Sequence, residues 1–228
     1  MLVKQAEVIV GGTSQTSKMP GRSWSTSARR CVVGGKLRGV KGSTCSHCYA
    51  LQGAYNWDSY ENAADRRWDA LQRALSSAAS KALFIRAMVT IASRQRHFRW
   101  HDSGDIHGVE HLRMIVAIAK AAPNTLFWLP TREYGLVAQY LDSGETIPDN
   151  LVIRISAPMI AQNPRALKCR FAGVSGITFS TVGLSEDNPE QVTLQCPSRR
   201  YQNTCGPCRA CWSPNALVID YPLHGYEV

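Results

Sequence analysis

The sequence lacks the long apolar segments that membrane proteins and secreted precursors carry. The best candidate for an apolar run, residues 114–119, lies between Arg113 and Lys120 and is far shorter than the ~18 residues that a helix needs to cross a bilayer. The first twelve residues contain Gln5 and Glu7, and no small-residue cleavage site follows an apolar core, as a signal peptide would require. We therefore expect a cytoplasmic protein, in the host cytoplasm if a phage encodes it, with no membrane partner.

Internal repeats, low-complexity tracts and long runs of basic residues are also absent. The 228 residues are 44% hydrophobic and 19% charged, a composition typical of a globular protein with a sizeable core. The formal charge of +9 favours polyanions or phosphorylated ligands, so a nucleic acid or a nucleotide is an expected partner. No run of Lys and Arg exceeds two residues. The alternative is therefore that the basic residues are scattered over the surface and bind no particular partner.

Strand and helix patterns alternate through the middle of the chain. Apolar residues at helical spacing predict helices over 58–76, 81–93, 109–121 and 133–142. Aromatic and β-branched runs predict strands over 97–102, 125–130, 151–155, 174–181 and 216–221. Repeated strand–helix units with short loops indicate parallel strands, hence an α/β sheet or a partial (β/α) barrel.

The C-terminal third has a different composition. Residues 157–173 and 185–214 contain several prolines, and both stretches are expected to form loops. We predict that residues 1–184 form the partial α/β barrel. Residues 185–228 are predicted to form a cysteine-rich metal-binding loop, followed by a final strand that returns to the barrel.

Seven of the eight cysteines fall into two groups, and Cys169 stands alone. The N-terminal cysteine group consists of Cys31, Cys45 and Cys48, and the C-terminal cysteine group of Cys196, Cys205, Cys208 and Cys211. In a reduced cytoplasm, clustered thiols are more readily explained as metal ligands than as disulfides. All seven are therefore candidate metal ligands.

The C-terminal cysteine group has the spacing of an iron–sulfur site. Cys205, Cys208 and Cys211 are each separated by two residues, and the upstream Cys196 is followed by Pro197, as in ferredoxin runs that bind a [4Fe–4S] cluster. Zinc usually takes pairs of Cys-x-x-Cys knuckles, which a third cysteine at the same spacing does not suit. The pattern favours a four-iron cluster, with zinc as the alternative metal and unliganded thiols as a further alternative.

The N-terminal cysteine group offers only three thiolates. A four-iron cluster held by three cysteines leaves one iron without a protein ligand, and that iron can bind a substrate or a cofactor, as the open position of a catalytic metal does. The alternative is a single structural site, with zinc or one cluster, that joins Cys45 and Cys48 to ligands from the C-terminal cysteine group.

Polar residues follow several of the predicted strands. Alternation puts residues two apart on one side of a strand, which pairs Arg99 with His101, Arg154 with Ser156, and Thr178 with Ser180. The carboxyl ends of parallel strands are where α/β proteins place ligand sites. The residues expected to contact a ligand there are Asp102, Asp105, Thr131, Arg132 and Arg154. Arginine suits a carboxylate or phosphate, and the acids suit an amino group or ribose hydroxyls, while ion pairs and strand-end caps are the alternative roles.

The order of these motifs resembles the partial barrel of the radical S-adenosylmethionine (SAM) superfamily. Cys45-Ser46-His47-Cys48 follows a first strand, and Ser103-Gly104-Asp105 follows the next. The resemblance implies an open cluster on the three cysteines, and it makes Ser103-Gly104-Asp105 the counterpart of the Gly-Gly-Glu-type motif that contacts the methionine amino group. The sequence departs from that superfamily in one respect, because thirteen residues separate Cys31 from Cys45 where the usual loop has three.

More narrowly, three segments resemble the bacteriophage family gene product 88. They are Cys48-Tyr49-Ala50, the segment 101–105, and the segment 205–212. The resemblance covers most of the chain and implies iron–sulfur binding.

The expected function is that of an iron–sulfur protein, with one or two clusters, that cleaves SAM and acts on a nucleic acid or nucleotide. Ser103, Gly104, Asp105, Arg154 and Ser156 are the expected cofactor-binding residues. Asp105 is expected to hold the SAM amino group, and Arg154 its carboxylate or a substrate phosphate. The alternative is a non-catalytic iron–sulfur or zinc protein that binds nucleic acid or transfers electrons. If the protein is redox-active, an electron donor is a further expected partner.

Overall fold

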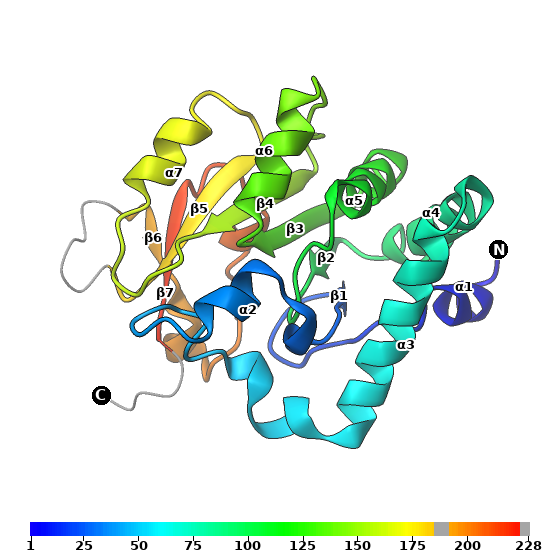
Figure 1. Cartoon of the computed structure of the whole chain (residues 1–228), viewed down its shortest axis with the longest axis horizontal. Helices are drawn as coiled ribbons and strands as arrows, with labels where there is room; N and C mark the ends of the chain where they lie inside the picture. The colour runs from blue at the N-terminus through cyan, green and yellow to red at the C-terminus, as the bar shows by residue number, and fades with distance from the viewer. Residues whose placement is uncertain (185–191, 224–228) are drawn as a thin grey trace.

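The computed structural model describes residues 1–184 and 192–223, which form a parallel sheet with helices packed along one face (Figure 1). Within these residues the sheet has seven strands in the order β1-β2-β3-β4-β5-β7-β6. The strands are β1 (Arg22–Trp24), β2 (His97–Trp100), β3 (Leu126–Thr131), β4 (Leu151–Ser156), β5 (Ile177–Val182), β6 (Leu194–Gln195) and β7 (Val218–Tyr221).

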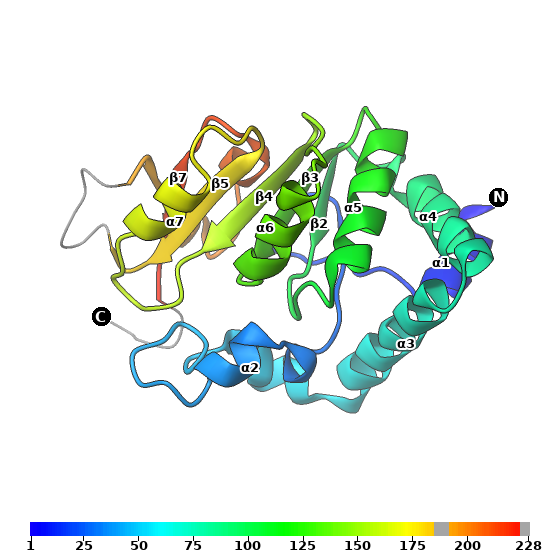
Figure 2. The same ribbon diagram turned by 45° about the horizontal axis from the view of Figure 1, so that its top comes forward.

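The α-helices are α1 (Val3–Val10), α2 (Val33–Leu37), α3 (Asp58–Leu75), α4 (Ala78–Ala92), α5 (Val109–Ala121), α6 (Tyr134–Asp142) and α7 (Arg165–Arg170). Helix α1 precedes the first strand, and the other α-helices lie between strands in sequence. Figure 2 shows α2 at the end of the sheet toward which the arrows of β4 and β5 point. Short 3-10 helices adjoin the cysteines: η1 (Ala28–Arg30), η2 (Tyr49–Leu51), η3 (Gly53–Asn56), η5 (Pro197–Tyr201) and η6 (Ala210–Trp212). No helix in the described part of the chain is long and apolar enough to span a membrane.

The predicted parallel α/β sheet is confirmed, whereas the barrel is not. Strands β1 to β5 are neighbours in sequence order, and all the pairings are parallel. In the part of the sheet that is described, β1 and β6 are the two edges and are not paired with each other. The sheet is therefore open. Because its strands are parallel, their carboxyl ends meet at one edge.

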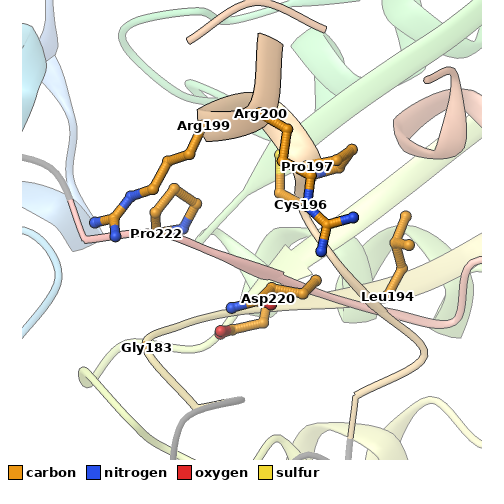
Figure 3. Close-up of a pocket in the computed structure, with 9 residues that line it drawn as sticks. Gly183, Leu194, Cys196, Pro197, Arg199, Arg200, Asp220 and Pro222 are labelled. Carbon is orange, nitrogen blue, oxygen red and sulfur yellow. The ribbon is translucent and has the colours of Figure 1, made fainter. Parts of the chain in front are cut away.

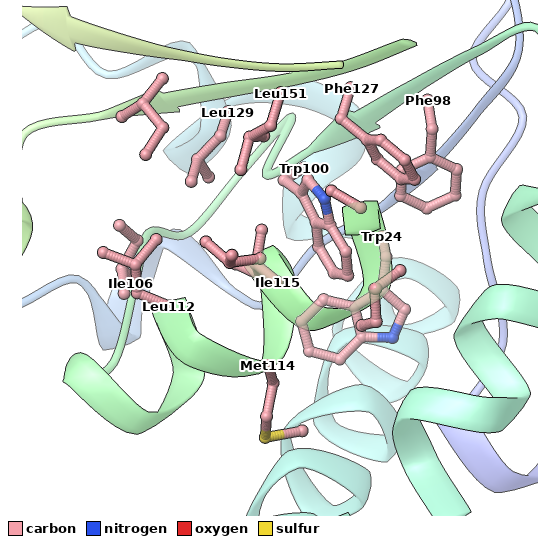
Figure 4. Packing of buried hydrophobic residues seen from close by; sticks show 14 of the residues in the cluster. Trp24, Phe98, Trp100, Ile106, Leu112, Met114, Ile115, Phe127, Leu129 and Leu151 are labelled. Atoms are coloured by element: carbon pink, nitrogen blue, oxygen red, sulfur yellow. The ribbon is translucent and has the colours of Figure 1, made fainter. Parts of the chain in front are cut away.

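The face of the sheet covered by helices is apolar. Side chains from alternating strand positions pack against α5 and its neighbours in the main core (Figure 4). The largest fully buried members include Trp24, Phe98, Trp100 and Phe127. Trp68 is partly buried and packs against this core.

The opposite face carries polar and aromatic residues, and the C-terminal segment covers part of it. Trp212 in η6 is buried there, and its Nε1 donates a hydrogen bond to Phe98 O at 2.9 Å. The Trp212 ring also packs on Trp128, with 5.4 Å between ring centroids. Strand β7 lies between β5 and β6, so this segment also extends the sheet. Residues 185–191 and 224–228 of the predicted second unit lie outside the described residues.

Two local features differ from the sequence pattern. Helix α7 lies within the loop-rich stretch 157–173 and begins after Pro164, where Asn163 Oδ1 accepts a hydrogen bond from Arg165 N at 2.8 Å. His101 does not share the side of Arg99. Its backbone φ of 57° takes it out of the strand, and its ring packs toward Trp24, with 6.3 Å between ring centroids.

Candidate functional site

A cavity of about 120 Å³ lies among the loops that follow β1, β2, β3 and β4. The structure brings to it three sets of residues that the sequence had predicted: the N-terminal cysteine group, Ser103-Gly104-Asp105, and Ser156. Arg99, Asp102, Thr131 and Arg132 also line it. The structure therefore places these residues together at the carboxyl edge of the sheet.

The cysteine-bearing loop is attached to three different strand-end loops. Tyr49, which follows Cys48, donates from its hydroxyl to the carbonyl of Asp102 after β2. The loops after β3 and β4 hold the segments near Cys31 and Cys45. The hydrogen bonds are Tyr49 Oη to Asp102 O (2.5 Å), Val33 N to Glu133 Oε1 (2.8 Å) and Thr44 N to Pro158 O (2.9 Å). Each cysteine therefore has an anchor within two residues of it.

Two of the thiols approach each other across Gly34. A Cβ atom at this position would lie 3.1 Å from Cys31 Cβ and 3.5 Å from Cys45 Sγ. A larger side chain at position 34 would push into the space that these cysteines share. The absence of a side chain there allows α2 to pack directly beside the thiols.

Gly104 fixes the segment after β2. Its φ is +76°, and a Cβ atom would lie 2.8 Å from Thr26 O, so only glycine fits this close approach to the loop after β1. Ser103 Oγ donates to the same Thr26 carbonyl at 2.6 Å. The segment is thereby held against the loop that leads to the cysteines.

Asp105 ties the loop after β2 to the end of β3. Its carboxylate accepts hydrogen bonds from Thr131 Oγ1 (2.6 Å), Ile106 N (2.8 Å) and Arg132 N (2.9 Å). Burial raises the pKa of Asp105, although these hydrogen bonds act in the opposite direction. A carboxylate has about four acceptor positions, so one remains for a ligand.

Arg154 does not lie where the ligand-binding prediction put it. It is fully buried and is not among the residues that line the cavity. Its guanidinium donates to the carbonyls of Phe179 (3.0 Å), Ala216 (2.9 Å) and Ala210 (3.3 Å). Arg154 therefore holds the C-terminal segment against the sheet.

The C-terminal cysteine group is supported by β7 and by the N-terminal loop. Cys196 N donates to Asp220 O, and Cys205 N donates to Lys18 O, both at 2.8 Å. Cys211 Sγ lies 3.1 Å from the hydroxyl of Tyr221. Burial raises the pKa of Cys211 to about 11, against the influence of this hydroxyl and of the Arg154 charge.

The thiols of each group lie near enough for their charges to interact. Burial is the main cause that raises the pKa of Cys31, and Asp105, Cys48 and Cys45 raise it further. In the C-terminal cysteine group, burial and then Cys196 raise the pKa of Cys205. Without a cation, these thiols favour the protonated form, and metal binding must displace those protons.

A second cavity, of about 370 Å³, adjoins the C-terminal cysteine group (Figure 3). Cys196, Arg199, Arg200 and Asp220 line it. Both arginines are exposed, whereas Asp220 is buried and accepts from Thr181 Oγ1 at 2.6 Å. The cavity thus places basic side chains beside a candidate metal ligand.

The arrangement does not form a site for a single metal ion. In residues 1–184 and 192–223, no three His, Cys, Asp or Glu side chains are placed to hold one ion. Zinc needs its ligand atoms about 2.0–2.3 Å from one centre, whereas a four-iron cluster takes each thiolate on a different iron. Metal binding itself stays a prediction.

The sequence profile of the gene product 88 family matches residues 15–214. The chain belongs to the gene product 88 family. No curated protein and no solved structure matches the chain. The gene product 88 match includes both cysteine groups and every residue that lines the first cavity. The resemblance to radical SAM enzymes has no support from these comparisons.

Sequence reasoning missed two residues of this site. Glu133 had been assigned to the start of a helix, yet its side chain holds the loop of Cys31 through Val33. Arg99 had been noted only for the side of the strand that it occupies, yet it lines the cavity. The signal for Glu133 was its position just after the predicted strand 125–130, and the signal for Arg99 was its side of the predicted strand 97–102.

Proposed function

We propose that this gene product 88 protein binds a four-iron cluster on its N-terminal cysteine group and acts as a radical-SAM-type enzyme on a nucleic acid or nucleotide. The observation that carries the proposal is the meeting of Cys31, Cys45 and Cys48 with the segment 103–105 in one cavity at the carboxyl edge of a parallel sheet. Three thiolates leave one iron open to a ligand. The sequential order of β1 to β5 is also the order of strands in a (β/α) barrel.

The residues of the cavity suit a ligand that carries an amino group and a carboxylate. Asp105 has one acceptor position left for an amino group, and the Ser156 hydroxyl lies on the same cavity. Arg132 and Arg99 replace Arg154 as the cations that can bind a carboxylate, because both line the cavity and both have a buried Nε without a hydrogen-bond partner among the described residues. When bound, the cluster supplies one-electron chemistry and a coordination position.

The C-terminal cysteine group provides four thiols, so a cluster there has no open iron. Its expected role is to pass electrons or to stabilise the fold. This closed group also favours the second candidate function, a non-catalytic iron–sulfur protein that transfers electrons or binds nucleic acid. The net charge of +9, and Arg199 and Arg200 beside the second cavity, support a phosphorylated partner in either case.

The test begins with the composition of anaerobically purified protein. Two clusters give about eight irons and eight acid-labile sulfides per chain. Stoichiometric zinc without sulfide would reject the cluster proposal. The loaded protein is then mixed with dithionite and SAM.

Cleavage takes one electron from dithionite and one hydrogen atom from substrate or solvent. It breaks the bond between sulfur and C5′ and yields methionine and 5′-deoxyadenosine. Cys48→Ser should abolish this turnover, whereas Cys169→Ser, which changes an exposed cysteine outside both groups, should leave it unchanged. If fully loaded protein neither binds nor cleaves SAM, the non-catalytic function takes the place of the enzyme.

A further inference from the structure

Arg99 lies between the two cysteine groups. It belongs to β2, on the face opposite the main core, and its guanidinium carbon stands 4.4 Å from the centroid of the Trp128 ring. On one side it lines the cavity of the N-terminal cysteine group. There its Nη2 lies 3.4 Å from the hydroxyl of Tyr49, the residue after Cys48.

Two routes lead from Arg99 to the C-terminal cysteine group. In the first, Arg99 Nη1 donates to Met19 Sδ at 3.0 Å, and the neighbouring Lys18 carbonyl accepts from Cys205 N at 2.8 Å. The second route runs through the aromatic side chains of β3 and β7. Its contacts are Arg99 on Trp128, Trp128 stacked on Tyr221 with 6.5 Å between centroids, and the Tyr221 hydroxyl 3.1 Å from Cys211 Sγ.

The charge on Arg99 is only partly compensated. None of the ion pairs within the described ranges includes Arg99, and its buried Nε finds no hydrogen-bond partner there. Burial disfavours the charged form, but the neighbouring Tyr49 and Asp102 hold the pKa of Arg99 above its usual value. The guanidinium therefore remains a cation, and its field extends to both groups at reduced screening.

We propose that Arg99 raises the reduction potentials of both clusters, so that one side chain tunes the two cysteine groups. The proposal rests on the proposed function, because each group must hold a cluster. A cluster that gains an electron gains a negative charge, and a nearby cation favours that reduced form. Arg99 is a positioning residue in this role, since it acts on the clusters through charge and not through ligation.

The test is a potentiometric titration of the doubly loaded protein, followed by electron paramagnetic resonance. Each cluster takes one electron from dithionite, which is oxidised to sulfite. Arg99→Gln should lower the equilibrium constant for reduction about tenfold at each cluster, which is ~59 mV for one electron. Cys208→Ser, which lacks one C-terminal ligand, assigns the remaining signal to the N-terminal cluster.

Two further variants complete the experiment. Arg96→Gln removes the same charge from an exposed position just before β2, and it should move neither potential. Asp102→Asn removes the carboxylate whose charge acts on Arg99. Because this leaves the positive charge of Arg99 less compensated, both reduction potentials should rise. This variant tests the proposal even if the Arg99→Gln protein fails to take up iron.

The outcomes separate the two proposals. A shift at one cluster only, or at neither, overturns the shared role of Arg99 while leaving the clusters in place. A chain without iron and sulfide overturns the proposed function itself.

Discussion

The two cysteine groups use the same residue type in different surroundings. The N-terminal cysteine group has three thiols beside a cavity, held by hydrogen bonds to loops after β2, β3 and β4. The C-terminal cysteine group has four thiols. Its last member, Cys211, lies 3.1 Å from the Tyr221 hydroxyl, and the next residue, Trp212, is buried against the sheet. Each group adjoins a cavity, of about 120 Å³ at the first group and about 370 Å³ at the second. The contrast therefore lies in the number of thiols: three thiols support the proposed ligand binding at the first group, and four support the proposed electron-transfer or structural role of the second.

The largest expected effect comes from removing the packing of the C-terminal cysteine group. Trp212→Ala removes a buried ring and its hydrogen bond to Phe98 O, and we expect it to lower the free energy of unfolding by about 3–5 kcal/mol. Urea denaturation measures the change. Trp57→Ala serves as the control, because Trp57 is 65% exposed and should change stability by less than about 0.5 kcal/mol. Equal effects at both positions would mean that η6 does not pack as described.

The next effect should fall on the cavity side. Gly104→Ala forces a side chain into positive φ and against Thr26, and we expect a loss of about 2–5 kcal/mol together with weaker metal loading. Gly144→Ala is a matched control. Gly144 has a φ of +79° but nothing within 4 Å of an added Cβ, so its loss should be only about 1–2 kcal/mol. Thermal unfolding of both variants isolates the contribution of the contact with Thr26.

Glu133 offers a test of the anchor beside Cys31. Glu133→Ala leaves the Val33 N–H without its acceptor and should cost about 1–3 kcal/mol, whereas Glu133→Gln keeps an acceptor oxygen. Burial raises the pKa of Glu133, so its ionisation disfavours the folded state, and this penalty is relieved as pH falls through the raised pKa. The wild type should therefore gain stability relative to Glu133→Gln as pH falls from 7 toward 5. A constant difference across that range would contradict the assignment.

The smallest effect concerns the hydroxyl beside Cys211. Tyr221→Phe removes a contact of 3.1 Å that lowers the pKa of Cys211, so the pKa should rise above its value of about 11. In metal-free protein, alkylation of Cys211 should then be slower at a given alkaline pH, as mass spectrometry of pH-dependent labelling would show. Tyr201→Phe alters a partly exposed ring and should leave this rate unchanged.

Local sequence patterns predicted many of the helices and strands, because long amphipathic segments show a clear periodicity of apolar residues. The helix over 109–121 was predicted at the bounds that α5 has, since its apolar residues recur at helical spacing over more than three turns. The three residues of β1 and the two of β6 are too short to show a period. Their strand character comes from pairing with distant segments.

The candidate site was predictable where it depended on strand order and not where it depended on distant packing. Cysteines after β1 and Asp105 after β2 meet because parallel strands end at one edge. Arg154 also lies near the carboxyl end of a predicted strand, but its guanidinium donates hydrogen bonds to the carbonyls of Ala210 and Ala216 and is not available to a ligand. Alternation gives the face of a strand and does not reveal which remote segment will cover it.

The insertion of β7 between β5 and β6 has a consequence for how the chain is completed during synthesis. Strand β6 leaves the ribosome first, but its only partner in the described sheet is β7, which follows more than twenty residues later. A nascent chain therefore carries β6, Cys196 and the outer edge of β5 unpaired until β7 emerges and docks with both strands in one event. A released chain truncated before residue 218 should keep β1 to β5 assembled and leave the C-terminal cysteine group open to chaperones and proteases.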